Sequence, residues 1–303
     1  MRPRFLVLLA AYNGMKWIGE QVASILSQQD ILVDILISVD QSNDGTESWV
    51  DDLVARDKRV SVLPHGEKFG GAALNFFRLI READATGYDY IALADQDDIW
   101  LPHKLIRAHT VLMSSGADGY SSNVIAFWPD GREKLVVKSQ PQTSYDFLFE
   151  AAGPGCSYVL ASHLFDELKT HIVLNTEHLQ KIDLHDWYCY AFSRSKGFKW
   201  TIDTVSGMRY RQHSNNQFGV NSGIQAIKLR LAQVLEGWWL NQSRLTVIAL
   251  GIANDSLVEA VLKTNRMSTF KLALQGYQCR RRIRDKFAFS ILCLLLTVTG
   301  QHK

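Results

Sequence analysis

Apolar residues in the first hundred positions fall into short runs that alternate with segments of helical periodicity. The runs are bounded by glycine or polar residues, as buried parallel strands are, and they lie at residues 5–11, 33–39, 60–63 and 90–94. The intervening segments repeat apolar residues about every 3.6 positions, and they lie at residues 15–28, 46–56 and 72–83. This alternation predicts an α/β fold with a mostly parallel sheet that is covered by helices on both faces.

Polar residues cluster where three of these strands end. Asn13 follows the first strand, residues 40–46 follow the second, and residues 95–98 follow the fourth. Ligands of open parallel sheets bind beyond the carboxyl ends of the strands. The sequence therefore predicts one binding site at this edge of the sheet.

The remaining two thirds of the chain has a different pattern. Residues 115–213 are mixed, and the elements expected there are strands at 124–128 and 136–137 around a turn, an extended segment at 200–212 and a helix from His185. After residue 222 the pattern is helical, with an apolar stripe formed by Ile227, Leu231, Val234, Leu235 and Trp238. We expect a catalytic domain at 1–220, divided near residue 115 into two halves, and a helical region at 221–303.

The net charge and the cysteines bear on whether the protein binds nucleic acid and on the compartment in which it works. The 303 residues include 33 Lys and Arg against 31 Asp and Glu, a net charge of +2 that does not call for nucleic acid. The four cysteines form no C-x-x-C pair, which favours a reduced, cytoplasmic compartment. The apolar run at 5–11 is too short for a secretory signal.

The acidic cluster at 95–98 carries the first chemical prediction. Asp95, Asp97 and Asp98 would repel one another at a strand end unless a cation or solvent relieved the repulsion. A hard divalent ion such as Mg²⁺ or Mn²⁺ takes carboxylate and phosphate oxygens together. Two alternatives remain open: a solvated acidic turn, and the nucleophile loop of a metal-dependent phosphatase. That phosphatase motif normally continues with glycine, whereas Ile99 and Trp100 follow here.

Four segments in order resemble the inverting glycosyltransferases of family 2, which have the GT-A fold, a Rossmann-like nucleotide-binding fold. They are Ala11-Tyr12-Asn13-Gly14, Asp40 with Ser42-Asn43-Asp44-Gly45-Thr46, Ala94-Asp95-Gln96-Asp97-Asp98-Ile99-Trp100, and His185-Asp186-Trp187. The resemblance covers about residues 4–218. It implies an enzyme that moves a sugar from a nucleotide-sugar donor to a glycan, and Mg²⁺ or Mn²⁺ as cofactor.

The resemblance also implies roles for individual residues. Asp97 and His213 are the expected metal ligands. The residues expected around the nucleotide-sugar are Ala11, Tyr12, Asn13, Asp40, Gly70, Asn75, Asp95, Gln96 and Arg211. Asp186 is the expected catalytic base, because inverting transfer needs one free carboxylate to take the proton of the acceptor hydroxyl. Where the family often has Glu-Asp, this chain has His185-Asp186, so Asp186 is the only carboxylate of that pair.

A narrower resemblance concerns the donor. The Asp-Gln-Asp-Asp-Ile-Trp and His-Asp-Trp segments, followed by Tyr210-Arg211-Gln212-His213 with Asn216 and Gly219, are similar to bacterial rhamnosyltransferases of O-antigen and capsule assembly. That similarity implies dTDP-L-rhamnose as donor and a saccharide or lipid-linked saccharide as acceptor. A UDP-hexose or UDP-N-acetylhexosamine donor remains the alternative within the same fold.

The C-terminal segment pairs a basic cluster with an apolar run. Arginines fill four of the five positions 280–284, and residues 287–298 are apolar except for two hydroxyl side chains. Twelve helical residues rise about 18 Å, short of the roughly 30 Å needed to cross a bilayer. The segment is expected either to contact the inner face of the bacterial plasma membrane peripherally or to pack on the protein.

Overall fold

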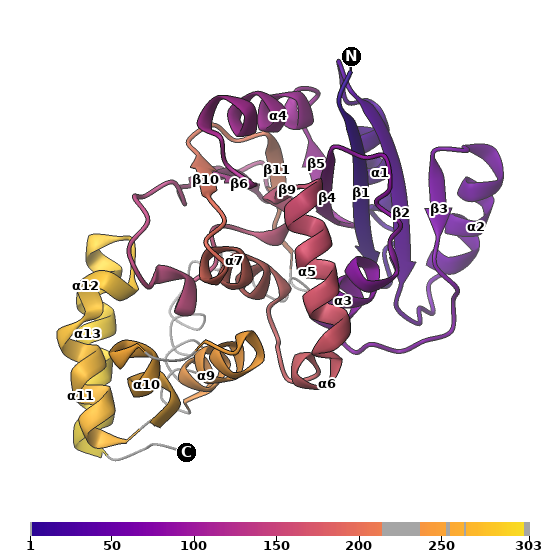
Figure 1. Ribbon diagram of the computed structural model, residues 1–303. Coiled ribbons are helices and arrows are strands. Elements are labelled where there is room, and N and C mark those ends of the chain that lie inside the picture. Colours follow the sequence, from indigo (N-terminus) through magenta and orange to yellow (C-terminus); the bar gives the residue numbers. More distant parts are fainter. Residues whose placement is uncertain (1, 214–236, 253–254, 264, 300–303) are drawn as a thin grey trace.

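A computed structural model describes residues 2–213, 237–252, 255–263 and 265–299 of the chain (Figure 1). The apolar stripe expected at 227–235 and the motif positions Asn216 and Gly219 lie outside the described residues. The main sheet has seven strands in the order β10-β6-β9-β4-β1-β2-β3. Their bounds are β1 Arg4–Ala11, β2 Leu32–Val39, β3 Val60–Val62, β4 Tyr90–Asp95, β6 Gly119–Ser122, β9 Val159–Ala161 and β10 Trp200–Asp203.

The main sheet is parallel except at β9, which runs antiparallel to both of its neighbours. In the register of β1, Ala11 pairs with Val39 of β2 and Ala10 pairs with Asp95 of β4. The three strands therefore end level with one another. This alignment brings the polar segments that follow them to one edge, as the sequence predicted.

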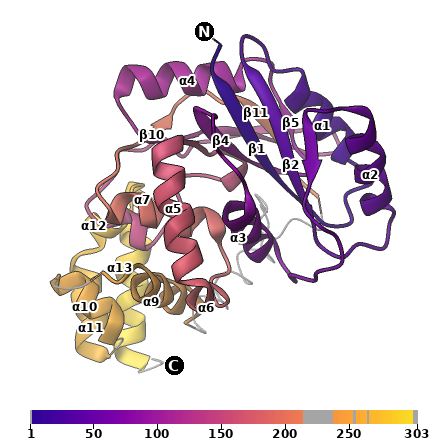
Figure 2. The same cartoon turned by 45° about the vertical axis from the view of Figure 1, so that its right-hand side comes forward.

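Alternate side chains of β1 enter two separate cores. Leu6 and Leu8 belong to one core with helices α3, α5 and α7, whereas Val7 and Leu9 belong to another with α1, α2 and α4. The helices are α1 Ile18–Leu26, α2 Thr46–Arg56, α3 Ala72–Glu82, α4 Lys104–Ser115, α5 Ser162–Leu174, α6 Thr176–Leu179 and α7 His185–Ser195. Figures 1 and 2 show the sheet between these layers. The period-two alternation of a strand buried on both faces explains why β1 is apolar throughout.

A second, four-stranded sheet has the order β5-β11-β7-β8. Its strands are β5 Ile99–Trp100, β7 Val124–Phe127, β8 Glu133–Val136 and β11 Met208–Arg211. The two strands expected around the turn form the hairpin of β7 and β8, but the second strand, expected at 136–137, lies at Glu133–Val136. The single extended segment expected at 200–212 is wrong in detail: it divides into β10 in the main sheet and β11 in the second sheet.

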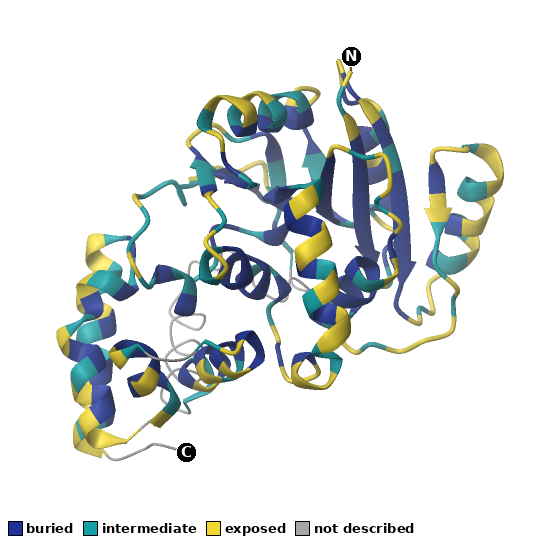
Figure 3. Cartoon of the chain, in the orientation of Figure 1, coloured by how far each residue is buried: buried dark blue, intermediate teal, exposed yellow. Residues whose placement is uncertain are grey.

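The C-terminal helices form a third core at one end of the molecule (Figure 3). They are α9 Trp238–Leu250, α10 Ser256–Lys263, α11 Arg266–Leu274, α12 Gly276–Cys279 and α13 Ile283–Thr299. Leu148 and Phe149, in and beside the short helix η1 (Asp146–Leu148), are part of this core. The helical region therefore packs directly on the second half of the segment 1–220. No helix in the described part of the chain is both long and apolar enough to cross a membrane.

Candidate active site

A cavity of about 990 Å³ opens at the carboxyl ends of β1, β2 and β4. All but one of the site residues expected from the sequence line it: Ala11, Tyr12, Asn13, Asp40, Gly70, Asn75, Asp95, Gln96, Asp97, Asp186 and His213. Arg211 is the exception. Segments separated by more than 170 residues in the chain thus line the same cavity.

Asp40 shapes the loop that covers one end of the cavity. Its side chain is nearly buried, and its two carboxylate oxygens accept hydrogen bonds from the backbone N–H groups of Phe69 and Gly70, both at 2.9 Å. Gly70 has a φ of +75°, a left-handed conformation that glycine adopts without strain. A carboxylate has about four lone-pair positions, so Asp40 keeps capacity to accept a hydrogen bond from a ligand.

Gln96 holds the backbone of Tyr12 at the rim of the cavity. Its side-chain amide accepts from the N–H of Tyr12 at 2.8 Å and donates to the C=O of Tyr12 at 2.7 Å. A Cβ atom at Gly14 would lie 2.3 Å from Oε1 of Gln96, so a larger residue there would displace the Gln96 side chain from this position. The ring of Tyr12 is 56% exposed, which leaves it able to stack on a planar base.

Two asparagines tie the strand ends together. Asn13, at φ 46°, accepts a hydrogen bond on Oδ1 from the N–H of Asn43 at 2.9 Å. Asn75 is buried, and its Nδ2 donates to the carbonyls of Ala11 and Ser38 at 3.3 and 3.1 Å. Both side chains therefore position the walls of the cavity at the ends of β1 and β2.

Asp97 and His213 contact each other in the lining of the cavity. Nε2 of His213 lies 2.6 Å from Oδ2 of Asp97, and the imidazole ring stacks on Trp17 with ring centroids 4.2 Å apart. The stacking fixes the ring plane, and Nε2 of the imidazole faces the carboxylate oxygen of Asp97 directly. A carboxylate and an imidazole in this arrangement are common ligands of Mn²⁺ and related ions.

Arg211 lies beneath the acidic loop rather than in the cavity. Its Nε donates to the carbonyl of Asp97 at 2.7 Å, its backbone N–H donates to Oδ1 of Asp98 at 3.0 Å, and its guanidinium pairs with Glu20. The guanidinium also lies over the ring of Phe127, 4.7 Å from the centroid. These contacts give Arg211 a positioning role for the loop at 95–98.

The charge that lines the cavity is strongly negative. Five carboxylates and two lysines are among the described lining residues: Asp40, Asp95, Asp97, Asp183, Asp186, Lys68 and Lys138. Burial, together with the neighbouring charges of Asp97 and Asp186, raises the pKa of Asp95 to about 7. A bound divalent cation would relieve this repulsion and would also allow an anionic diphosphate to enter. The carboxylate of Asp97 and the imidazole of His213 are donor types that suit a divalent ion such as Mn²⁺.

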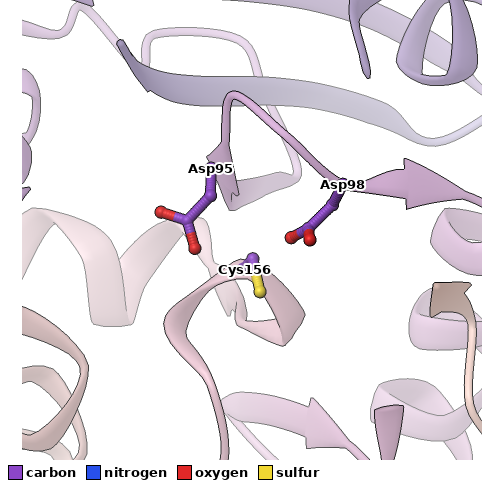
Figure 4. Close-up of side chains that lie close together, drawn as sticks. All are labelled: Asp95, Asp98 and Cys156. Atoms are coloured by element: carbon purple, nitrogen blue, oxygen red, sulfur yellow. The ribbon is translucent and has the colours of Figure 1, made fainter. Parts of the chain in front are cut away.

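A second group of potential ligands lies behind the cavity. Ligand atoms of Asp95, Asp98 and Cys156 are within 4.8 Å of one another (Figure 4). Asp98 is fully buried, and burial followed by the charges of Asp97 and Asp95 raises its pKa well above the usual value. Burial likewise raises the pKa of the Cys156 thiol, so the sulfur stays protonated. A neutral thiol is a poor ligand for a hard cation, and we interpret the buried Asp98 and Cys156 as packing beneath the site.

Asp186 faces the cavity from the first turn of α7. Its Oδ1 accepts the N–H of Trp187 at 2.7 Å, and burial raises its pKa to about 6, with a smaller opposing effect of the Lys138 charge. The neighbouring His185 stacks on Phe76 at 3.9 Å, and burial lowers its pKa to about 3. Asp186 is therefore a carboxylate that is ionised at neutral pH beside an uncharged imidazole.

Comparison with known proteins places the chain among glycosyltransferases. Residues 6–154 match the family described as Glycosyl transferase family 2. The dTDP-rhamnosyl transferase RfbG of Shigella flexneri is 42% identical over 291 residues, which is 96% of this chain and 100% of the relative. The putative teichuronic acid biosynthesis glycosyltransferase TuaG of Bacillus subtilis (strain 168) is 30% identical over 112 residues, 37% of this chain and 43% of the relative.

The chain belongs to glycosyl transferase family 2. It is a nucleotide-sugar glycosyltransferase, as the motifs predicted. The alternative that it is a metal-dependent phosphatase is therefore wrong.

Solved structures support the fold. S. aureus TarS 1-349 in complex with UDP superposes with a TM-score of 0.57 at 12% identity, over 98% of this chain and 92% of that chain. Mannosyltransferase PcManGT from Pyrobaculum calidifontis, in complex with GDP-Man and Mn²⁺, gives 0.51 at 16% identity, over 99% and 88%. The expected GT-A fold with C-terminal helices is confirmed.

Sequence reasoning missed three charged residues of the cavity. Lys68, Lys138 and Asp183 line it but belong to none of the recognised motifs. The carboxylate of Asp183 accepts hydrogen bonds from Trp238 Nε1 at 2.6 Å and Gln242 Nε2 at 3.0 Å, both on α9. No local pattern in the sequence pairs these distant positions. Asp183 could have been found only from its position, because it lies three residues before the expected catalytic base Asp186.

Proposed function

We propose that this enzyme transfers L-rhamnose, with inversion, from dTDP-L-rhamnose to a saccharide acceptor in the synthesis of a bacterial surface polysaccharide. The donor is supported by the full-length similarity to a protein named as a dTDP-rhamnosyl transferase. The observation that carries the mechanism is the placement of Asp97 with His213 and of Asp186 as lining residues of one cavity.

In this proposal the strand-end side of the cavity binds the nucleotide. Tyr12 stacks on the pyrimidine, and Asp40 accepts the N3–H that thymine and uracil both carry. Asn13, Asn75 and Gln96 hold the loops that present these groups, and Ala11 and Gly70 allow the backbone to approach the ligand. The shared N3–H explains why UDP-hexose and UDP-N-acetylhexosamine remain the alternative donors.

Asp97 and His213 are proposed to hold Mg²⁺ or Mn²⁺, with Asp95 beside them. When bound, the ion supplies positive charge that stabilises the leaving nucleoside diphosphate. Asp95 and Asp97 then contribute to donor affinity rather than repelling it.

Asp186 is proposed to act as the catalytic base. As the acceptor oxygen bonds to the anomeric carbon and the bond to the diphosphate breaks, the carboxylate takes the proton of the acceptor hydroxyl. A pKa of about 6 leaves this carboxylate ionised at neutral pH and brings it closer to the operating pH than an ordinary aspartate. Lys138 and Asp183 lie on the same side and are proposed to contact the acceptor.

The proposed acceptor determines where in the cell the enzyme would act. A lipid-linked saccharide would bring the enzyme to the cytoplasmic face of the bacterial plasma membrane. The four free cysteines, all buried, suit a reducing compartment.

The test is a donor comparison with the purified full chain. Transfer to a saccharide acceptor is measured from dTDP-L-rhamnose, UDP-glucose, UDP-N-acetylglucosamine and GDP-mannose, each with Mn²⁺, Mg²⁺ or EDTA. We expect metal-dependent transfer and donor consumption with dTDP-L-rhamnose and at least about tenfold less with the others, a difference of about 1.4 kcal/mol. A clear preference for a UDP-sugar would overturn the rhamnose assignment, and EDTA-resistant transfer would overturn the metal role.

A further inference from the structure

The last helix, α13, is apolar on two opposite sides. One side is exposed, and its side chains recur every three or four residues: Ile283, Phe287, Ile291, Leu294, Leu295 and Val298. Residues at this spacing share one side of a helix. Phe289, Cys293 and Leu296 are buried on the other side, where they join the C-terminal core. The buried side alone explains the packing of the helix, so the exposed side needs another explanation.

Exposed apolar residues are concentrated in this part of the molecule. Ten of the nineteen large hydrophobic residues that are exposed in the described ranges lie between 267 and 298. They include Met267, Phe270 and Leu274 of α11, a helix that packs along α13. Single exposed apolar residues are ordinary, whereas a concentration of this kind marks a contact with a partner or a membrane.

The charge of the same segment indicates which partner it fits. Residues 265–299 contain one acidic residue, Asp285, and seven Arg and Lys, of which four lie outside the protein contacts of Arg280, Arg281 and Arg282: Arg266, Lys271, Arg284 and Lys286. Arg284 lies at the start of the exposed side and its side chain is 79% exposed. Two copies of the chain meeting through this surface would bring like charges together, whereas an anionic lipid surface would complement them.

Three of the arginines that precede α13 face the protein instead. Arg280 donates to the carbonyl of Phe149 at 2.8 Å, and Arg282 donates to the carbonyl of Val137 at 2.5 Å. Arg281 donates to Asp146 at 2.9 Å. Of the two alternatives that the sequence left open for this segment, packing on the protein is the one that these three arginines follow. These contacts fix α13 against residues 137–149, which precede the lining residue Ala151.

The length of α13 suits a helix that lies in a membrane surface. Its 17 residues span about 26 Å, less than the roughly 30 Å hydrocarbon core. A helix with an exposed apolar side and flanking basic residues buries that side at the boundary of headgroups and acyl chains.

We propose that the exposed side of α13 docks the enzyme on an anionic lipid bilayer. This rests on the proposed function and deepens it, because the contacts of Arg280, Arg281 and Arg282 hold the docked helix in a fixed position relative to the half of the cavity that carries Asp186. A lipid-linked acceptor would then meet the enzyme at the membrane surface.

Vesicle sedimentation of the full chain tests the docking surface. Vesicles of phosphatidylcholine with phosphatidylglycerol are compared with vesicles of phosphatidylcholine alone. The double variant Phe287→Glu/Ile291→Glu changes the proposed surface. Leu174→Glu, at the end of α5 and 77% exposed, is the matched control. We expect wild type and Leu174→Glu to sediment with anionic vesicles, and the double variant to bind at least about tenfold less tightly.

Equal vesicle binding by wild type and the double variant, or no binding by wild type, would overturn the proposal. A wild-type dimer in sedimentation velocity that the double variant abolishes, without vesicle binding, would assign the surface to a second copy. Transfer to a soluble acceptor is measured on each protein. Vesicle binding without transfer from any nucleotide-sugar would leave the docking surface standing and remove the proposed function instead.

Discussion

The two sides of the cavity are built in different ways. The proposed donor side is held mainly by contacts within the first hundred residues, such as those of Gln96 with Tyr12 and of Asp40 with Gly70, and His213 joins it through Asp97. The acceptor side depends on contacts between distant parts of the chain. Arg281 reaches across 135 positions to Asp146. One side is therefore held mainly by the N-terminal motifs, whereas the C-terminal helices hold the other.

A buried ionic network supports the acceptor side. Asp146 is fully buried, and its carboxylate accepts from Tyr190 at 2.8 Å, Arg194 at 3.2 Å and Arg281 at 2.9 Å. Tyr190 and Arg194 lie one and two turns after Asp186 on α7. The second terminal nitrogen of Arg281 donates to the carbonyl of Ala151, a lining residue, at 2.6 Å. The C-terminal region thereby positions both the helix and the loop that form this side.

Replacing the proposed base should have the largest effect. Asp186→Asn keeps the shape of the side chain but removes its ability to take a proton, so we expect kcat to fall about 10²- to 10⁴-fold. Nucleotide affinity should be unchanged, because the nucleotide is proposed to bind on the donor side of the cavity. Asp166→Asn, an exposed substitution on α5, is the control in steady-state assays. A loss of less than about fivefold would remove Asp186 from the reaction.

Breaking the network should damage the acceptor side selectively. Arg281→Met leaves Asp146 with one fewer cationic partner, and a broken buried pair costs about 3–5 kcal/mol of unfolding free energy. We expect the KM for the acceptor to rise and kcat to fall, with the nucleotide affinity of the folded protein unchanged.

Arg281→Lys should restore part of the activity, since it keeps the charge. Denaturant titration measures the free energy of unfolding. Separate titrations of donor and acceptor measure how far each affinity changes. If nucleotide affinity falls as far as acceptor affinity, the two sides are not independent.

The pH dependence at saturating metal should report Asp186, because a bound cation would keep the nearby Asp95 ionised. With the pKa of Asp186 near 6, kcat/KM should be level above pH 7 and should fall about tenfold per pH unit well below 6. The same burial has a consequence for stability. A folded-state pKa above the unfolded value favours folding at low pH, and this contribution is lost as pH rises through 6.

Asp186→Asn should therefore melt at a higher temperature than wild type at pH 7.5, by about 2 °C or more, and at the same temperature near pH 4. Calorimetry at the two pH values measures this difference. A difference that grows as pH falls would contradict the assigned pKa.

The smallest effect is expected on the donor side. Gln96→Ala removes two hydrogen bonds to the backbone of Tyr12, each worth about 1 kcal/mol. We expect nucleotide affinity to fall about five- to thirtyfold, with little change in the pH profile. Gln29→Ala, an exposed substitution, is the control in binding titrations. Unchanged affinity would show that the position of Tyr12 does not limit donor binding.

The same contrast explains what the sequence predicted. The strands that end at Ala11, Val39 and Asp95 were found because buried parallel strands are apolar runs followed by polar loops. Helix α5 was not predicted because its apolar positions lie within the stretch of mixed pattern, and α4 was not predicted because it lies between that stretch and the strand that ends at Asp95. The inward direction of Arg281 was not predictable, because a basic run beside an apolar helix has the same sequence whether it meets a membrane or a buried carboxylate.

Titration of Mn²⁺-dTDP into three proteins tests the division of the cavity most directly. We expect wild type and Asp186→Asn to bind with the same affinity, and Asp97→Ala to lose at least about tenfold, an effect that EDTA should reproduce in wild type. Equal binding by Asp97→Ala and wild type, or a loss confined to Asp186→Asn, would contradict the assignment of donor and metal to one side and of the base to the other.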